Sequence, residues 1–389
     1  MILDNRKIKI CALTTVSKTM DMFMAHSMRF LSENGYEVTL VCNMSEGFND
    51  RHGDFAKCVD LKMSRGVSVK DLFSCTFSLY KLFRKEKFDI VYYATPNVSF
   101  YASIAATLAG VKHRNYCQWG IRYVAFSGMK RKVFKLVEKL TCAFSKTVRS
   151  ASPMNMEFSI NEKLCKREKI SVIGIGGTVG VEIEKCENFN HAEAREKWRA
   201  HYGIDKESFL YGFVGRINVD KGLNELITAF KSVSQSIENA SLVLIGDVDE
   251  INPIDKENFE FAQNAENIIL TGNVPSEQIY EHMAMFDVLV HPSYREGFGK
   301  VLQEAMGMKI PVITTNIPGP SEVIENNVSG ILANVKDATD LADKMLLLYN
   351  DCDLRASFAN EGYKRAKQYF DRPIMLKNIL DDVDAIVKK

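Results

Sequence analysis

The 389-residue sequence has no two cysteines in a C-x-x-C arrangement, and its nine cysteines are odd in number and scattered. This distribution argues against a zinc site and against a disulfide framework. It is typical of a chain whose thiols stay reduced, so we expect a cytoplasmic location.

Long apolar runs are also missing. Every run is interrupted well before the roughly 20 residues that a membrane-spanning helix needs. The N-terminus enters a predicted strand almost at once, so we expect no cleavable signal peptide. With 46% hydrophobic and 25% charged residues, the composition is that of a globular protein, and the length suffices for two domains.

Two common phosphate-binding signatures are absent. The turn after the first predicted strand, at 15–20, contains no glycine, so the G-x-G-x-x-G dinucleotide fingerprint is not where it would have to be. The sequence from Gly215 to Gly222 does not match the spacing G-x-x-x-x-G-K-[ST], which disfavours a P-loop ATPase.

The net charge of +1 conceals an asymmetry between the two halves. Residues 1–180 hold 28 Lys and Arg against 15 Asp and Glu, which gives +13, whereas the remainder holds 22 against 34, which gives −12. Such a split indicates that the first half faces an anionic partner, either nucleic acid or an anionic membrane surface. An ordinary solvated basic surface is the alternative.

Strand and helix patterns alternate along the chain, which predicts an α/β fold of parallel strands with right-handed crossovers. A strand over 7–14, a helix over 21–33 and a strand over 36–42 open the first half, and the alternation restarts with a strand over 209–214. Four glycines within 174–180 indicate a hinge, followed by a polar linker over 182–190. The predicted first domain covers 1–180, the second covers 181–371, and a terminal helix over 372–389 packs back on the first.

Ligands of open parallel sheets sit at the carboxyl ends of the strands. In the first domain this rule brings three stretches, 14–18, 95–97 and 118–123, to one rim.

The segment 128–144 predicts an amphipathic helix. Its basic face comprises Lys130, Arg131, Lys132, Lys135 and Lys139, and its apolar face Val133, Phe134, Leu136, Val137, Leu140 and Phe144. Such a helix can lie on an anionic membrane. Alternatively it is a domain helix whose apolar side packs on the sheet, and both hold if only the basic edge touches lipid.

The second half contains the most informative stretch, 287–307. A buried strand over 287–291 breaks at Pro292, and a Gly-Phe-Gly turn then opens a helix at about Lys300. The exposed N–H groups at such a turn suit an anionic ligand. Because Glu296 precedes the turn and Glu304 follows it, the stretch indicates a nucleotide-sugar pocket.

Arg216 and Lys221 lie in another strand-to-helix connection. The guanidinium of Arg216 can donate two parallel hydrogen bonds to a diphosphate, and the ammonium of Lys221 can bind it as a mobile point charge. Each cation alone is weak evidence, but two of them facing the Gly-Phe-Gly turn and its carboxylates form a stronger pattern.

Three motifs, Gly215-Arg216-x4-Lys221-Gly222, Gly272-x-Val274 and Glu296-Gly-Phe-Gly-x4-Glu304-Ala305, resemble the retaining glycosyltransferases of family 4, the glycosyl transferases group 1. The resemblance covers essentially the whole second domain. It implies the GT-B fold, in which two Rossmann-like, doubly wound parallel-sheet domains face an interdomain cleft. The donor-binding residues that it implies are Gly215, Arg216, Lys221, Gly272, Val274, Glu296, Gly297, Phe298, Gly299, Lys300 and Glu304.

The resemblance also implies separate roles. Arg216 and Lys221 would hold the donor diphosphate and act in catalysis, together with Glu296 at the transferred sugar. Glu304 would bind the ribose hydroxyls, and Gly272–Val274 would lie beside the base. Two structural alternatives stay open: Glu304 caps loop N–H groups, or Glu296 forms an ion pair with Arg295.

The first domain matches the family less well. Its rim reads Gln118-Trp119-Gly120-Ile121-Arg122-Tyr123, which looks like the branch that builds bacterial surface polysaccharides. The candidate acceptor-side residues are Thr15, Gln118, Trp119, Gly120 and Arg122.

The expected function is transfer of a hexose or N-acetylhexosamine from a UDP-sugar to a lipid-linked or growing surface glycan. We expect no metal or other cofactor, since side-chain cations stabilise the leaving diphosphate. We further expect no nucleic-acid partner, peripheral contact with an anionic membrane, and a place on the cytoplasmic face of the inner membrane. The alternatives are a GT-B sugar-nucleotide epimerase or phosphorylase, or a non-catalytic nucleotide- or nucleic-acid-binding protein.

Overall fold

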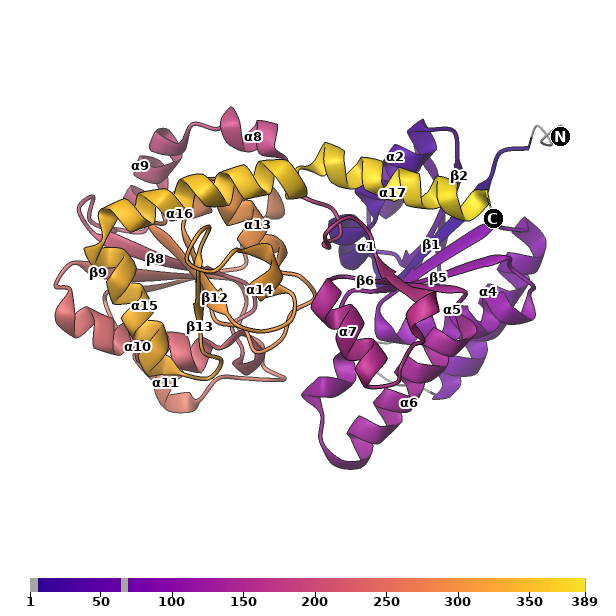
Figure 1. The fold of residues 1–389 in the computed structure, drawn as a ribbon, viewed down its shortest axis with the longest axis horizontal. Coiled ribbons are helices and arrows are strands. Elements are labelled where there is room, and N and C mark those ends of the chain that lie inside the picture. The colour runs from indigo at the N-terminus through magenta and orange to yellow at the C-terminus, as the bar shows by residue number, and fades with distance from the viewer. Residues whose placement is uncertain (1–5, 64–68, 389) are drawn as a thin grey trace. The chain divides into compact units, whose positions relative to one another are not determined.

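The computed structural model describes residues 6–63 and 69–388 and divides the chain into two compact units (Figure 1). The first unit comprises residues 1–179 and 373–389, and the second comprises 180–372. These boundaries differ by one residue from those predicted from the sequence.

The first unit is built on a parallel sheet of seven strands in the order β3-β2-β1-β4-β5-β6-β7. Its strands are β1 (Lys9–Val16), β2 (Glu37–Asn43), β3 (Ala56–Asp60), β4 (Ile90–Ala94), β5 (His113–Gln118), β6 (Thr147–Ser150) and β7 (Ile170–Val172). The strand order reverses between β1 and β4, so the crevice for a ligand lies where these two strands end.

Helices cover both faces of this sheet. They are α1 (Ser17–Phe23), α2 (Ala25–Glu33), α3 (Phe48–His52), α4 (Val69–Glu86), α5 (Pro96–Leu108), α6 (Gly128–Phe144), α7 (Pro153–Asn161) and α17 (Arg372–Val387). One core cluster joins the sheet to α1, α2 and α17, and another joins it to α4, α5 and α6. The single helix predicted over 21–33 is two helices, because the backbone leaves the helical conformation at Met24, with φ −134° and ψ −36°.

The C-terminal helix α17 belongs to the first unit and lies beside α2 (Figure 1). Val383 and Ile386 are buried in the cluster of α1, α2 and the sheet. Asp382 receives two hydrogen bonds from the guanidinium of Arg149, at 2.9 and 2.7 Å. This bidentate geometry is among the stronger ion-pair arrangements in proteins, and it fixes α17 against β6.

Helix α6 has the predicted bounds but presents a different face to the core. Glu138, Thr141 and Cys142 are its buried residues, whereas Val133 and Leu136 are 48% and 56% exposed. The interpretation in which the apolar side packs on the sheet is therefore wrong for Val133 and Leu136.

The buried carboxylate of Glu138 accepts hydrogen bonds from Tyr116 Oη at 2.9 Å and from Gln118 Nε2 at 2.7 Å. Burial raises the pKa of Glu138 above its ordinary value, since the two donors offset desolvation only in part. In such a case the folded protein is most stable below the ordinary pKa, and stability is lost as the pH rises toward the raised one.

We expect Glu138→Gln to remove this loss, because both hydrogen bonds go to Oε1 and an amide oxygen can accept them. The urea midpoint of the variant should exceed that of the wild type at about pH 8, and the gap should shrink at about pH 5. Glu157→Gln, at an exposed pair with Arg167, is the control. A gap that is equal at both pH values would contradict the expectation.

The second unit contains a parallel sheet of six strands in the order β10-β9-β8-β11-β12-β13. The strands are β8 (Phe209–Val214), β9 (Ala240–Ile245), β10 (Ile268–Gly272), β11 (Val288–His291), β12 (Val312–Thr315) and β13 (Ile331–Ala333). Here the order reverses between β8 and β11, which defines the crevice of this sheet.

The helices of the second unit are α8 (Ile183–Glu187), α9 (His191–His201), α10 (Leu223–Ser236), α11 (Lys256–Asn264), α12 (Ile279–Met283), α13 (Lys300–Gly307), α14 (Pro320–Val323), α15 (Ala338–Asn350) and α16 (Cys352–Arg365). The segment 182–190, predicted as a linker, contains α8 instead. Ile183 and Cys186 are buried there, and a Cβ on Gly307 of α13 would lie within 3.6 Å of both side chains.

Candidate active site

Residues predicted from two distant motifs meet at the crevice of the second sheet. Gly215 and Arg216 follow β8, Lys221 ends a short 3-10 turn (Val219–Lys221), and Glu296 follows β11. Since β8 and β11 flank the point where the strand order reverses, these side chains occupy the ligand-binding edge of the sheet.

The carboxylate of Glu296 is the centre of this cluster. Its Oε1 accepts hydrogen bonds from Lys221 Nζ, from His291 Nε2 at 2.9 Å and from Ser293 Oγ at 3.1 Å. Burial opposes ionisation of Glu296, but the charge of Lys221 and the hydrogen bonds outweigh it and hold the pKa of this carboxyl well below its ordinary range. Glu296 is therefore ionised at every pH at which the protein would work.

His291 completes the cluster as a neutral ring. Burial lowers its pKa, and the nearby Lys221 charge adds to that effect although the bond to Glu296 opposes it. The ring stacks on Phe213 with centroids 5.6 Å apart. A neutral imidazole that donates from Nε2 fixes the orientation of the Glu296 carboxylate without adding a second positive charge.

Gly222 explains how Lys221 reaches a residue 75 positions away. Its backbone is left-handed, with φ +71°, and a Cβ there would lie 2.0 Å from the carbonyl oxygen of Pro292. Only glycine allows this approach. Together with the hydrogen bond from Tyr294 N to Asp220 O (2.8 Å), it holds the turn after β8 against the turn after β11.

Arg216 lies in a more open place than Lys221. Its side chain is 69% exposed and donates to Asp249 Oδ2 at 2.9 Å, whereas that of Lys221 is 20% exposed. Asn218 Nδ2 donates to the same carboxylate at 3.0 Å. These donors lower the pKa of Asp249, with the Asn218 hydrogen bond as the largest cause.

Asp249 also closes an Asp-x-Asp sequence, Asp247-Val248-Asp249, directly after β9. Such a pair of carboxylates can hold a divalent cation next to a diphosphate. Within residues 6–63 and 69–388, however, no three His, Cys, Asp or Glu side chains are grouped so that they could hold a metal ion. The expectation that no metal takes part therefore stays a prediction. Its test must ask whether Asp247 and Asp249 bind a divalent cation.

The predicted glycine turn ends where α13 begins. Gly299 has a left-handed backbone, with φ +94°, and Lys300 is the first residue of the helix. Glu304 lies one turn further and pairs with Lys300 at 2.8 Å, while Phe298 is buried against the Phe370 ring. Arg295 pairs with Asp220 at 2.5 Å and Glu296 with Lys221, so the predicted alternative of an Arg295–Glu296 ion pair is wrong.

The remaining donor-side candidates follow other strands. Gly272 ends β10, the outermost strand, and its carbonyl accepts a hydrogen bond from Gly246 N at 3.0 Å. Val274 follows two residues later and is half-buried. Both lie along the carboxyl edge of the sheet, two strands away from Lys221.

In the first unit one acceptor-side candidate, Thr15, lies at the crevice between β1 and β4. Thr15 Oγ1 lies 2.7 Å from Thr95 Oγ1, and Thr15 N donates to the same oxygen at 3.1 Å. Thr95 has φ 72° and ψ 139°, a conformation that residues with side chains rarely adopt and that costs about 1–3 kcal/mol. The contact between the threonines thus joins the two strand ends at a strained position.

Other acceptor-side candidates are engaged within the unit. Gln118 is buried, donates to Glu138 and accepts from Ser159 Oγ at 2.8 Å. The guanidinium of Arg122 lies over the Phe134 ring, 5.3 Å from its centroid. Gly120 has no heavy atom within 4 Å of where a Cβ would stand, so the backbone there is open.

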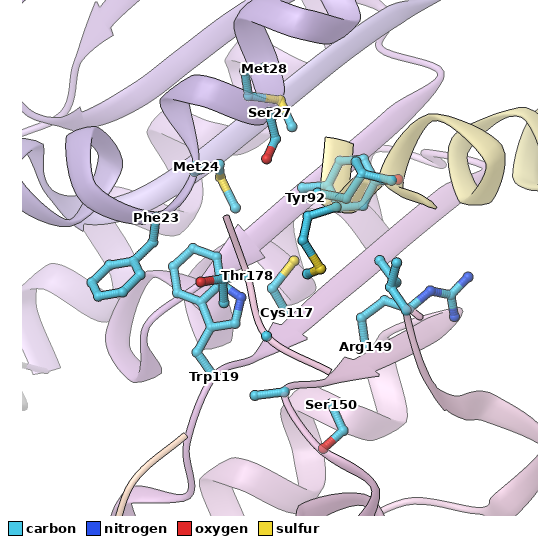
Figure 2. Close-up of a pocket in the computed structure, with 15 residues that line it drawn as sticks. Phe23, Met24, Ser27, Met28, Tyr92, Cys117, Trp119, Arg149, Ser150 and Thr178 are labelled. Atoms are coloured by element: carbon cyan, nitrogen blue, oxygen red, sulfur yellow. The ribbon is translucent and has the colours of Figure 1, made fainter. Parts of the chain in front are cut away.

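Trp119 lines a mainly apolar cavity of about 70 Å³ in the first unit (Figure 2). Its indole lies 5.6 Å from the Phe23 ring. Both rings lie on one side of the cavity and Arg149 on the other (Figure 2).

Comparison with known proteins decides the family. The family model described as glycosyl transferases group 1 matches residues 194–365, and that described as glycosyl transferase 4-like matches residues 9–152. The capsular polysaccharide biosynthesis glycosyltransferase CapM of Staphylococcus aureus is 31% identical over 382 residues, 98% of each chain. The chain belongs to the glycosyl transferases group 1 family. It is therefore a glycosyltransferase.

This glycosyltransferase has further relatives. The UDP-Gal:α-D-GlcNAc-diphosphoundecaprenol α-1,3-galactosyltransferase of Escherichia coli is 29% identical over 330 residues, 82% of each chain. The structure of Anabaena Alr3699/HepE in complex with UDP-glucose superposes with a TM-score of 0.80 at 19% identity, and covers 97% of this chain and 100% of that one. A glycosyltransferase of Rickettsia africae gives 0.79 at 19% identity, over 98% and 99%. These likenesses show that the predicted GT-B fold is correct.

Three residues of the glycosyltransferase site were not predicted from the sequence: His291, Ser293 and Asn218. Each contacts a predicted site residue: His291 and Ser293 bind Glu296, and Asn218 Oδ1 accepts a hydrogen bond from Lys221 N at 3.0 Å. A signal was available, since His291 is a polar residue that ends a buried strand at the edge where ligands bind.

The structure also bears on the membrane. No helix in the described part of the chain has both the length and the apolarity to cross a bilayer.

Proposed function

We propose that the protein is a retaining glycosyltransferase that moves a hexose or N-acetylhexosamine from a UDP-sugar to a lipid-linked or growing surface glycan. The observation that carries the proposal is the Lys221–Glu296 contact at the crevice of the second sheet, which joins two of the three family motifs. The names of its relatives support a lipid-linked or surface glycan as the acceptor. CapM is a capsular polysaccharide biosynthesis glycosyltransferase, and the E. coli relative uses a diphosphoundecaprenol acceptor.

The charges at this crevice suit the reaction. Breaking a sugar–diphosphate bond develops negative charge on the leaving phosphate and positive charge on the ring. Lys221 and Arg216 stabilise the phosphate, and the Glu296 carboxylate, permanently ionised, stabilises the ring and holds the sugar hydroxyls. The acceptor hydroxyl attacks the anomeric carbon as the phosphate leaves, and its proton passes to that phosphate.

The proposal includes three further points. The reaction requires no metal, because the side-chain cations replace it. The acceptor binds at the edge formed by Thr15, Thr95 and Trp119. The enzyme works as a peripheral protein on the cytoplasmic face of an anionic membrane, with the excess of basic residues in its first half facing the lipid.

The decisive experiment is a transfer assay with radiolabelled UDP-, GDP- and ADP-sugars and an undecaprenyl-diphosphate-linked acceptor, with and without EDTA. We expect transfer from a UDP-sugar, unaffected by EDTA, with the anomeric configuration retained. Donor consumption without transfer would point to an epimerase. Phosphate-dependent turnover would point to a phosphorylase, and an absolute need for Mn²⁺ or Mg²⁺ would assign Asp247 and Asp249 to a metal.

Glu304→Ala tests the ribose contact. A carboxylate that accepts hydrogen bonds contributes about 1.5–3 kcal/mol, so we expect the dissociation constant for UDP to rise about 10- to 100-fold. The thermal shift by UDP would shrink accordingly. Glu260→Ala, at an i,i+4 pair with Lys256, is the matched control and should bind UDP normally. Unchanged UDP binding by Glu304→Ala would refute the assigned role.

A further inference from the structure

Exposed apolar side chains are concentrated on three helices of the first unit. Among the described residues, six large apolar side chains are more than half exposed, and five of these lie on α4, α5 and α6: Phe73, Phe77, Leu108, Met129 and Leu136. The sixth, Ile251, lies in a loop of the second unit. Such a concentration marks an interaction surface rather than the scatter found on ordinary surfaces.

The three helices form one layer. Helix α5 packs against both α4 and α6, and all three contribute to the core cluster on the same face of the sheet. Each helix leads from the carboxyl end of one parallel strand back to the start of the next. The N-terminal halves of α4 and α6 therefore lie at the carboxyl edge of the sheet, where Thr15 and Trp119 also lie.

Helix α4 carries a continuous stripe toward solvent. Lys70, Phe73, Phe77, Lys81 and Arg84 recur at helical spacing and are all exposed. The two phenylalanine rings are 70% and 58% exposed, and Lys81 Nζ lies over the Phe77 ring, 4.3 Å from its centroid. The core of the unit does not account for this stripe, because α4 buries its opposite side through Cys75, Leu79 and Phe83.

Helix α6 likewise turns apolar side chains toward solvent. It places a carboxylate, Glu138, in the core and leaves Met129, Val133 and Leu136 in solvent as an i, i+4, i+7 stripe. Burying Glu138 while exposing three apolar side chains is unfavourable in water alone, so the stripe has a use outside the unit.

The charge around the two stripes has one sign. The exposed charged residues on α4 and α6 are Lys70, Lys81, Arg84, Lys85, Lys130, Lys132 and Lys139. The acidic residues of these helices are Asp71, Glu86 and Glu138, of which Glu86 pairs with Lys57 and Glu138 is buried. Aromatic and aliphatic side chains ringed by lysines fit an anionic bilayer interface.

We propose that this α4/α6 face, defined by Phe73, Phe77, Met129, Val133 and Leu136 with the lysines beside them, docks on an anionic lipid bilayer. The apolar side chains enter the headgroup region and the lysines bind lipid phosphate. The proposal deepens the proposed function and relies on it for its use: docking through these N-terminal halves holds the carboxyl edge of the first sheet near the lipid surface, where the head of a lipid-linked acceptor stands.

The test is co-sedimentation of the full chain with vesicles of phosphatidylcholine alone, or with about 30 mol% phosphatidylglycerol. We expect binding to the anionic vesicles only, weakened by high salt. F73S/F77S and V133S/L136S should each weaken it about tenfold or more, because burying each apolar side chain contributes roughly one order of magnitude. I251S/V335S removes two exposed apolar residues of the second unit and should bind like the wild type.

The outcomes separate this inference from the proposed function. Thermal stabilisation by UDP should be equal in all of these variants, since they lie outside the donor site. Anionic-vesicle binding by F73S/F77S and V133S/L136S at the wild-type level would overturn the docking proposal, even if sugar transfer is found. The proposal would also be overturned if the wild type did not bind vesicles but formed dimers that both double variants abolish. The face would then bind a second copy of the chain.

Discussion

Lys221→Met should lower kcat for sugar transfer by about 10²–10³-fold, the usual effect of removing one preorganised group that stabilises the charge of a transition state. The same substitution should also destabilise the fold, because Glu296, whose side chain is only 17% exposed, keeps only His291 and Ser293 as donors. Breaking a buried ion pair typically costs about 3–5 kcal/mol, most of it from the charge left behind.

A second substitution separates the two effects. Lys221→Met with Glu296→Gln removes the charge left behind, so the double variant should regain most of the lost thermal stability. Its kcat should stay as low as that of Lys221→Met, or fall further. The measurements are kcat by radiolabel transfer and Tm by calorimetry. Lys206→Met with Glu196→Gln, an exposed pair of the second unit at 2.9 Å, is the control and should change kcat little.

The pH dependence of stability provides a third test of the Lys221–Glu296 pair. In the wild type the lowered pKa of Glu296 makes its contribution to stability complete above its ordinary value of about 4.5, and that contribution is lost only as the pH falls toward the lowered value. Without Lys221 the pKa rises, so acid unfolding of Lys221→Met should begin at a higher pH. A double variant with nearly wild-type kcat would contradict the catalytic role of the pair.

The order of strands and helices could be predicted from the sequence because it depends on local patterns. The bounds of β8, 209–214, and of α6, 128–144, match the structure to the residue. The facing of α6 could not be predicted, since a hydrophobic stripe implies burial whereas here Tyr116 and Gln118 on β5 provide partners for Glu138. Those partners are distant in the sequence, so no local pattern reveals them.

The candidate site shows the same division. The glycine turn after β11 and the carboxylate of Glu296 are visible in one stretch of sequence. The alternative left open for Glu296, an ion pair with its chain neighbour Arg295, is wrong. Lys221 comes within reach instead, through the contact of Gly222 with Pro292. Close approaches of this kind depend on tertiary structure, and the sequence shows only that a glycine is present.

Asp287 is the site of the second large effect, this one on stability alone. Its carboxylate accepts from Arg199 Nη2 at 2.9 Å, from Arg195 Nη2 at 2.8 Å and from Leu210 N at 2.8 Å. It thereby links α9 to the starts of β8 and β11. Arg199 is buried. Its guanidinium also donates hydrogen bonds to the backbone carbonyls of Lys206 and Ser208, in the turn before β8, and of Met285.

Asp287→Ala leaves the Arg199 guanidinium buried without a carboxylate, so we expect the unfolding free energy of the second unit to fall by about 3–5 kcal/mol. Asp287→Asn should cost less, because an amide oxygen in the place of Oδ2 still accepts two of the three hydrogen bonds, those from Arg199 Nη2 and Leu210 N. The chain has two tryptophans, Trp119 in the first unit and Trp198 in the second. Urea unfolding in a Trp119→Phe background, followed by Trp198 fluorescence, therefore reports the second unit by itself.

The control is Glu196→Ala, which removes an ion pair with Lys206 on the surface of the second unit, at 2.9 Å. Both groups are exposed, so water replaces the lost partner and the stability of the second unit should change little. If Asp287→Ala unfolded at the same urea concentration as its background, the buried guanidinium would be satisfied by the backbone carbonyls alone. The carboxylate would then add nothing to the contact between α9 and the sheet.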